Sequence, residues 1–162
     1  MIKMMQRKRT KIVILGTADS GKTTTIENIL ERKREKVTKI EYKGTTVALD
    51  YGNTVVDGQR IHIFATPGQD RFKFMREILS NGIDGAIVVI DSLIGVTATD
   101  EDILTELNDK CIPYVIFANK QDLYQGIPES ECISEDAKII PTIAVDGEGI
   151  QEGLVELLRM MN

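Results

Sequence analysis

The sequence is poor in the residues that supply cross-links or transition-metal ligands. Its two cysteines, Cys111 and Cys132, lie far apart and form no CxxC pair. We therefore expect no disulfide framework, and a reducing, cytoplasmic compartment. His62 is the single histidine, and it alternates with Ile61 and Ile63 as a strand residue does. Without other histidines or cysteines around it, a transition metal has no ligand set.

Long apolar runs and an excess of positive charge are also lacking. No stretch reaches the length of a membrane span, and no secretory leader or lipidation signal is evident, so we expect no direct membrane anchor. The formal net charge is -5, which disfavours a general attraction to nucleic acid. Residues 1–10 are a short basic lead-in. They are either an arm for an anionic partner or, as we favour, a solvated terminus.

The chain does contain apolar runs that alternate with helical patterns. Its 162 residues are 42% hydrophobic and 28% charged, which suits one domain over 1–162. Strands are expected at 11–15, 46–56, 60–65, 84–91, 113–118 and 139–144, and helices at 22–34, 99–109 and 149–161. Asp57-Gly58 predicts a tight hairpin turn between two of the strands. The charged stretch 31–41 has no apolar period and is interpreted as a mobile or solvated loop.

This alternation predicts an α/β fold with a mostly parallel sheet covered on both faces. Ligands of such sheets bind at the carboxyl ends of the strands. Each of the motifs considered next follows directly after an expected strand, so we expect them to meet at one edge.

Residues 16–23 match the phosphate-binding pattern G-x-x-x-x-G-K-[ST], between a strand and a helix. Glycines let the backbone N–H groups face phosphate oxygens, and the helix adds the positive end of its dipole. The lysine is expected to reach the β- and γ-phosphates and assist catalysis, and Thr23 to ligate Mg²⁺. The candidate nucleotide-binding residues here are Gly16, Asp19, Ser20, Gly21, Lys22, Thr23 and Thr24.

A second motif, Asn119-Lys120-Gln121-Asp122, follows the expected strand at 113–118. It resembles the N-K-x-D guanine motif of the Ras-like small GTPases. The resemblance implies that Asp122 accepts hydrogen bonds from guanine, that the Lys120 stem lies over the base and that Asn119 braces the loops. Adenine presents the wrong donors to such a carboxylate, so an ATPase or nucleoside kinase is disfavoured.

The resemblance covers nearly the whole chain. It implies a three-layer G domain with a six-stranded, mostly parallel sheet, one antiparallel edge strand and about five helices. Thr46 matches the switch I threonine that binds Mg²⁺ and the γ-phosphate, with Thr45 as an alternative. In the second switch, Gly68 would contact the γ-phosphate and Gln69 would orient the attacking water. Ala144 and Val145 loosely match the alanine loop that closes over the base.

Two positions depart from the family pattern. Ala65 stands where the family has an aspartate that supports Mg²⁺ through a water, so we expect weaker magnesium binding. Ala18 stands where glycine is frequent, beside the γ-phosphate, and its methyl group is expected to crowd Gln69. Both favour slow intrinsic GTP hydrolysis, accelerated by a partner. The alternative is a GTP-binding interaction module with little or no hydrolysis.

Thr66-Pro67-Gly68-Gln69 resembles the second switch of a prokaryotic branch of small GTPases, near the gliding-motility and polarity GTPases. Some of that branch work with roadblock-type regulatory proteins, which is an analogy at the level of the family. Phe72, Phe74 and Met75 form either an exposed effector patch or a face packed beneath a helix. The expected protein is a molecular switch that binds a guanine nucleotide and a regulatory or effector protein.

Overall fold

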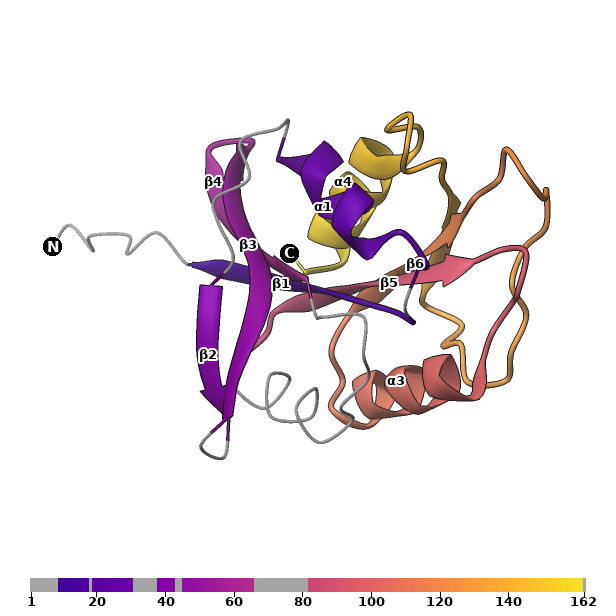
Figure 1. The fold of residues 1–162 in the computed structure, drawn as a ribbon, viewed down its shortest axis with the longest axis horizontal. Coiled ribbons are helices and arrows are strands. Elements are labelled where there is room, and N and C mark those ends of the chain that lie inside the picture. Colours follow the sequence, from indigo (N-terminus) through magenta and orange to yellow (C-terminus); the bar gives the residue numbers. More distant parts are fainter. Residues whose placement is uncertain (1–8, 18, 31–37, 43–44, 66–81, 162) are drawn as a thin grey trace, which may run out of the picture.

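The structure is a computed structural model of all 162 residues, which describes 9–17, 19–30, 38–42, 45–65 and 82–161. For 38–42 and 45–50 it describes the backbone alone. The elements in chain order are β1 (Thr10–Leu15), α1 (Lys22–Ile29), β2 (Thr38–Tyr42), β3 (Thr45–Val56), β4 (Gln59–Ala65), β5 (Gly85–Asp91), α3 (Ala98–Asp109), β6 (Tyr114–Asn119), β7 (Lys138–Pro141) and α4 (Ile150–Met161) (Figure 1).

The strands form one sheet in the order β2-β3-β4-β1-β5-β6-β7. Strands β4, β1, β5, β6 and β7 run parallel, and β3 pairs antiparallel with β4. This confirms the predicted six-stranded, mostly parallel sheet with one antiparallel edge strand. The β2 strand extends it by pairing with the first half of the long β3 strand, whose second half pairs with β4.

The predicted hairpin joins β3 to β4. Val56 pairs with Gln59, and the two turn residues Asp57 and Gly58 have φ angles of 50° and 78°. Two successive positive φ values define the turn type whose twist matches that of the flanking strands, which explains the Asp-Gly sequence.

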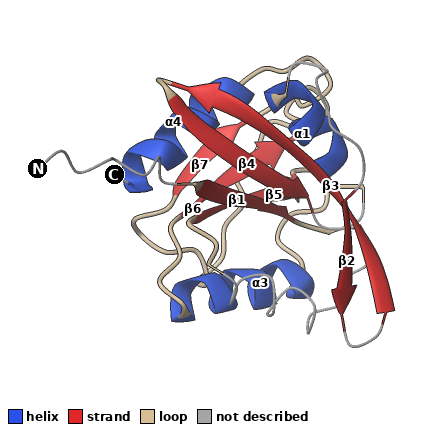
Figure 2. Ribbon diagram, turned by 90° about the vertical axis from the view of Figure 1, so that its left-hand side faces the viewer, coloured by secondary structure: helices blue, strands red, loops and turns tan. Residues whose placement is uncertain are grey.

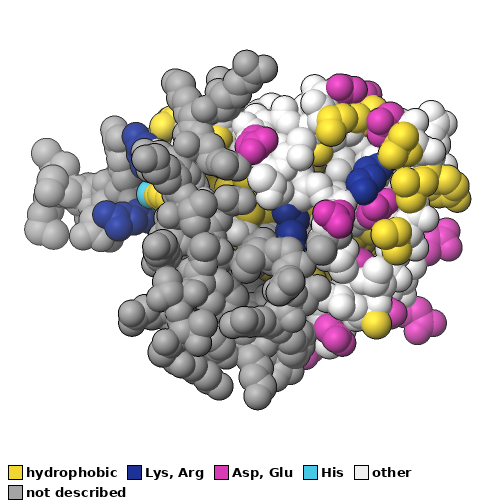
Figure 3. All heavy atoms as spheres, in the orientation of Figure 1, with side chains coloured by type: hydrophobic (Ala, Val, Ile, Leu, Met, Phe, Trp, Pro, Cys, Tyr) yellow, Lys and Arg dark blue, Asp and Glu magenta, His cyan; other side chains and the backbone are white. Residues whose placement is uncertain are grey.

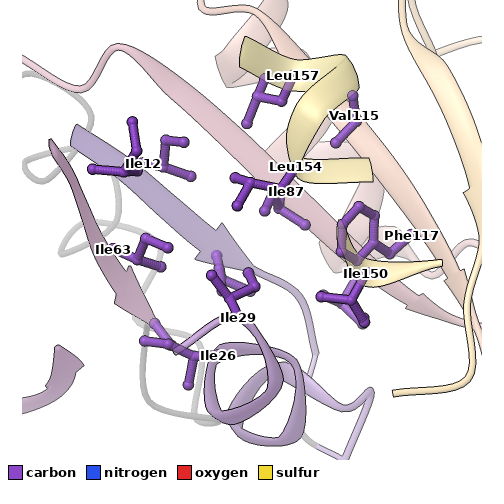
Figure 4. Close-up of a cluster of buried hydrophobic side chains, with 14 of the residues drawn as sticks. Ile12, Ile26, Ile29, Ile63, Ile87, Val115, Phe117, Ile150, Leu154 and Leu157 are labelled. Carbon is purple, nitrogen blue, oxygen red and sulfur yellow. The ribbon is translucent and has the colours of Figure 1, made fainter. Parts of the chain in front are cut away.

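Helices cover both faces of the sheet, as Figure 2 shows: α1 and α4 lie on one face and α3 on the other. Side chains of β1 alternate between two buried clusters, with Ile12 and Ile14 toward α1 and α4, and Val13 and Leu15 toward α3. Figure 4 shows the first cluster, in which side chains of α1 and α4 meet those of the strands. The α4 helix packs closely against β6 at Gly153, where the lack of a side chain leaves room for the Phe117 ring. A Cβ there would lie 2.2 Å from that ring.

The described residues contain three helices of the approximately five that we expected. Helix α3 begins with a capping box, in which the Thr97 side chain accepts from the Asp100 N–H and the Asp100 carboxylate accepts from the Thr97 N–H. No helix connects β6 to β7, where residues 120–137 form turns and irregular segments. No helix in the described part of the chain has the length and apolarity needed to cross a membrane.

The main local difference from the sequence-based expectation is β2. We interpreted 31–41 as a loop, but Thr38–Tyr42 pairs with β3 along its length. Thr38, Ile40 and Tyr42 alternate with Lys39 and Glu41, a period of two that the surrounding charges obscure. Residues 31–37 lie outside the described residues.

Candidate nucleotide-binding site

Residues 16–23, here called the phosphate loop, connect the end of β1 to the start of α1. A Cβ on Gly16 would lie 2.4 Å from the Val89 carbonyl oxygen, so only glycine lets the loop pass this close to β5. Asp19 has a φ of 63°, and Gly21, the N-cap of α1, has a φ of 113°. The chain therefore curls tightly around the helix N-terminus, which is the geometry that presents backbone N–H groups to an anion.

The side chains of the phosphate loop take different positions. Lys22 is buried, and its ammonium group donates a hydrogen bond to the Gly16 carbonyl oxygen across the loop. Ser20 is buried as well, and its hydroxyl has no hydrogen-bond partner among the described residues. Asp19 and Thr23 are exposed. The loop thus combines one buried cation with an exposed hydroxyl at the start of the helix.

Asn119 connects the phosphate loop to the rest of the site. Its side-chain NH₂ donates to the Ser20 carbonyl oxygen at 2.8 Å. Its side-chain oxygen accepts from the Ala144 N–H at 2.9 Å and from the Thr142 hydroxyl at 3.1 Å. Asn119 is itself buried, so these bonds fix the relative positions of three segments that are far apart in the sequence. This contact agrees with the bracing role that the sequence resemblance implies.

Residues 119–122, the Asn119 loop, continue from the end of β6. Lys120 has a φ of 67°, and its ammonium group lies 2.7 Å from an Asp91 carboxylate oxygen. The side chain of Asp91 is 8% exposed and that of Lys120 29%, so the pair is partly shielded from water. The other Asp91 oxygen accepts from the Leu93 N–H at 2.9 Å. Asp122 is exposed at the end of the loop.

Residues 142–149, the Ala144 loop, complete the edge. Ala144 is buried, whereas Val145 is 72% exposed. Asn28 of α1 donates hydrogen bonds to the Ala144 carbonyl oxygen and to the Thr24 carbonyl oxygen, so α1 is tied to this loop. β7 ends at Pro141, three residues earlier than expected, and the residues that follow form turns.

The site therefore lies where the carboxyl ends of β1 and β6 and the segment after β7 meet (Figure 1). Three residues that sequence reasoning missed take part in it: Asn28, Asp91 and Thr142. Asp91 was visible as the last residue of the expected strand at 84–91, but its pairing with Lys120 depends on the neighbouring positions of β5 and β6.

Several expected residues are not placed by the structure. Ala18, Gly68 and Gln69 lie outside the described residues. For Thr46 and its alternative Thr45 the structure gives only the backbone, in β3 opposite Glu41 and Tyr42. Ala65 is described: it is buried at the last position of β4.

His62 lies away from this edge. It pairs with Lys11, near the beginning of β1, and its ring nitrogen is 2.6 Å from the Tyr51 hydroxyl. Burial lowers the pKa of His62 below its ordinary value, and the positive charges of nearby basic residues lower it further. His62 is thus a strand residue stacked on Tyr51, as expected, rather than part of the site.

A phosphate loop joined by a buried asparagine to a second loop at the same sheet edge defines a P-loop nucleotide-binding domain. The family model of the elongation factor Tu GTP-binding domain matches residues 7–161. The chain therefore belongs to the family of elongation factor Tu GTP-binding domains and is a GTPase G domain.

The chain is also similar to individual proteins. The chain is 46% identical over 150 residues to an uncharacterized protein of Methanocaldococcus jannaschii, covering 91% of this chain and 94% of that protein. It is 28% identical over 155 residues to translation initiation factor IF-2 of Ureaplasma parvum, but spans only 25% of that factor.

Solved structures share the fold. The G domain of the FeoB iron transporter of T. maritima superposes with a TM-score of 0.70 at 21% identity, over 95% of this chain and 99% of that one. The small GTPase Arl6 of Trypanosoma brucei gives a TM-score of 0.63 at 19% identity, over 95% and 98%.

Proposed function

We propose that this protein is a molecular switch that binds GTP and GDP with Mg²⁺ and hydrolyses GTP slowly. The observation that carries the proposal is the position of Asn119, which is hydrogen-bonded both to the phosphate loop and to the Ala144 loop. A ligand that contacts all three loops would place its phosphates at the phosphate loop and a planar base between the Asn119 and Ala144 loops, as a nucleotide does. The family of GTP-binding domains supports guanine as that group.

In this proposal the backbone of the phosphate loop and the Lys22 ammonium bind the phosphates. Asp122 accepts from the N1–H and the exocyclic amine of guanine, and Lys120 covers the base with its stem. Ala144 and Val145 close the base site from the other side. Asp122 is exposed, and the Lys120 side chain is 29% exposed although its ammonium group pairs with Asp91, so a ligand can reach both.

Magnesium fits the donors that are present. Within the described part of the chain, no cluster of three or more His, Cys, Asp or Glu side chains could hold a metal by itself. The exposed Thr23 hydroxyl at the start of α1 would bind Mg²⁺ together with phosphate oxygens, and Thr46 would join it. The bound ion would neutralise charge on the β- and γ-phosphates.

Slow turnover follows from Gln69 acting beside Ala18 and from the absence of a carboxylate at Ala65, whose side chain is buried. Acceleration then requires a regulatory protein at the switches, for which a roadblock-type partner is one hypothesis. A cytoplasmic location suits the two free cysteines, of which Cys111 is exposed.

The base assignment is tested by Asp122→Asn. An asparagine presents a donor where the carboxylate presented an acceptor, so the variant should lose GTP and gain xanthosine triphosphate, which has a carbonyl in place of the amine. We expect GTP affinity to fall by at least about 100-fold, because the exocyclic amine of guanine loses its acceptor and faces the donor NH₂ of asparagine. Titration with fluorescent nucleotides measures both affinities.

Asp146→Asn is the matched control, since Asp146 is also exposed but follows Val145 in the Ala144 loop. It should leave the preference for guanine unchanged. If Asp122→Asn retains the wild-type preference for GTP, Asp122 does not read the base. If ATP binds the wild-type protein as tightly as GTP, the proposal of a guanine-specific site is wrong.

A second candidate function is a GTP-binding module that hydrolyses little or no GTP, and the buried Ala65 favours it. Single-turnover hydrolysis separates the two. Release of phosphate by the isolated protein, slow but above the solution rate, supports the switch, and no release with or without cell extract supports the module.

A further inference from the structure

Exposed apolar side chains are concentrated at one edge of the molecule. Seven large hydrophobic residues are exposed among those described, and six of them lie on the loops that follow β5, β6 and β7. We call these six the apolar edge: Leu93, Ile94, Leu123, Tyr124, Ile127 and Val145, each at least 54% exposed. Scattered apolar residues are normal on a surface, but six on three neighbouring loops need an explanation.

Hydrogen bonds hold these loops together. The Gln121 side-chain amide donates to the Ser92 hydroxyl at 2.9 Å and to the Gly126 carbonyl oxygen at 2.9 Å. The Gln121 backbone N–H donates to the Thr142 carbonyl oxygen. The apolar edge is therefore anchored by hydrogen bonds, since Ile94 lies two residues after Ser92 and Ile127 directly follows Gly126. Figure 3 shows the apolar side chains gathered on the right, where these loops lie.

The charges around the apolar edge are mostly negative. The same loops carry seven exposed carboxylates, and their cation Lys120 is paired with Asp91. The seven are Asp122, Glu129, Glu131, Glu135, Asp136, Asp146 and Glu148. Figure 3 shows acidic side chains among the apolar ones. The excess of negative charge extends through the sequence beyond residue 81, which has sixteen acidic residues. The basic residues there are Lys110, Lys120, Lys138 and Arg159.

We propose that the apolar edge binds a polypeptide of another protein that presents apolar side chains flanked by lysine or arginine. Apolar contact supplies the affinity, and the acidic surroundings select a basic partner and exclude an acidic one. A symmetric pairing of two copies of this chain is disfavoured, because it would place the same carboxylates opposite one another.

The apolar edge also adjoins the site of the proposed function, on which the next step rests. Lys120 and Asp122 precede Leu123 and Tyr124 in the loop after β6, and Val145 belongs both to the apolar edge and to the proposed base site. A partner that binds this surface with different affinity in the nucleotide-bound and nucleotide-free states changes nucleotide affinity by the same factor. The surface is thus placed to regulate exchange from the base side, separately from any partner at the switches.

The probe is a fluorescein-labelled amphipathic helical peptide of leucine and lysine, with a peptide of leucine and glutamate for comparison. Anisotropy is measured with the full-length protein in GDP and magnesium. We expect binding of the lysine peptide alone, weakened at least about tenfold in the double variant Ile94→Ser/Ile127→Ser by the loss of apolar area. Val55→Ser is the control, since Val55 is an exposed apolar residue of β3, away from this edge.

The acidic component is tested by Glu129→Gln/Glu148→Gln against Asp102→Asn, an exposed acid of α3. The first change should weaken the lysine peptide about threefold and reduce its salt dependence, and the second should do neither. Unchanged melting temperatures show that the variants are folded.

Equal binding of the two peptides, or equal loss with Val55→Ser, contradicts the proposal. So does light scattering that shows a dimer which only Ile94→Ser/Ile127→Ser dissociates, because a second copy would then cover the surface. Release of labelled GDP with and without the lysine peptide tests the coupling. If the peptide binds at this edge but the protein binds no guanine nucleotide, the proposed function fails and the docking surface stands.

Discussion

The phosphate loop and the Asn119 loop lie at the same sheet edge but are specified in different ways. The phosphate loop depends on backbone conformation, with positive φ angles at Gly16, Asp19 and Gly21. The Asn119 loop depends on side chains, since Asn119 alone makes three hydrogen bonds to distant segments and Lys120 makes an ion pair.

The difference suits the two parts of a nucleotide. Phosphates are common to all nucleotides, and the backbone N–H groups of a helix N-terminus bind them whatever the base, with Lys22 adding a positive charge. A base is distinguished from others by its pattern of donors and acceptors, which only positioned side chains can match. The two loops should therefore fail differently, the first when a Cβ is added and the second when a side chain is shortened.

The largest effect is expected for Gly21→Ala. A Cβ there would lie 2.2 Å from the Asn119 side-chain nitrogen, and the φ of 113° is unfavourable for alanine. We expect a loss of about 2 kcal/mol in the free energy of unfolding and a fall in nucleotide affinity of at least about 100-fold. Denaturant unfolding and nucleotide titration measure the two.

Gly58→Ala is the matched control. Gly58 has a φ of 78° in the hairpin turn, but nothing lies within 4 Å of its Cβ position. It should cost about 1 kcal/mol in backbone strain and leave nucleotide affinity unchanged. Equal losses of affinity in both variants would show that stability, rather than the shape of the phosphate loop, limits binding.

Asn119→Ala should have the next largest effect on nucleotide affinity. The change leaves the Ala144 N–H and the Ser20 carbonyl oxygen without their partner in a buried region, which costs about 1–3 kcal/mol for each unsatisfied group. Nucleotide affinity should fall with stability, because the three segments lose their common anchor. Asn108→Ala is the comparison, as Asn108 also makes two side-chain hydrogen bonds but lies on the exposed surface of α3. If Asn119→Ala keeps the wild-type affinity for the nucleotide, Asn119 does not anchor the three segments.

Much of the fold could be predicted because the buried strands have unmistakable sequences. The β-branched runs that became β1, β5 and β6 stop at glycine, aspartate or asparagine, and Asp57-Gly58 marks its own turn. The β2 strand was missed since its edge position imposes little hydrophobicity, and the charges of its neighbours masked its alternation. No helix or strand was expected between 123 and 137, and the structure has turns and irregular segments there.

The candidate site was predictable only where chemistry is carried by neighbouring residues. The phosphate loop and the Asn119 loop are contiguous motifs, so their sequences reveal them. The bonds from Asn119 to Ser20 and Ala144 join positions 99 and 25 residues apart, and the contact of Asn28 with Ala144 spans 116. Such contacts depend on the order of the strands in the sheet, which the sequence motifs alone do not determine.

The smallest effect is expected for Asp91→Asn, which tests whether charge or shape positions Lys120. Asparagine keeps an oxygen for the Leu93 N–H but removes the partner of the Lys120 ammonium. A partly exposed ion pair contributes up to about 1 kcal/mol, so nucleotide affinity should fall no more than about fivefold at low salt. Added salt should bring the wild-type affinity toward that of the variant, because it screens the pair. Glu156→Gln is the control: it breaks the pairs of this α4 residue with Lys138 of β7 and Arg159 of α4 and should change nothing at the site. A deficit in Asp91→Asn that persists undiminished at high salt would mean that the loop after β5 has changed shape. In that case Asp91, at the end of β5, would position the Asn119 loop through its hydrogen bond to the Leu93 N–H rather than through its charge.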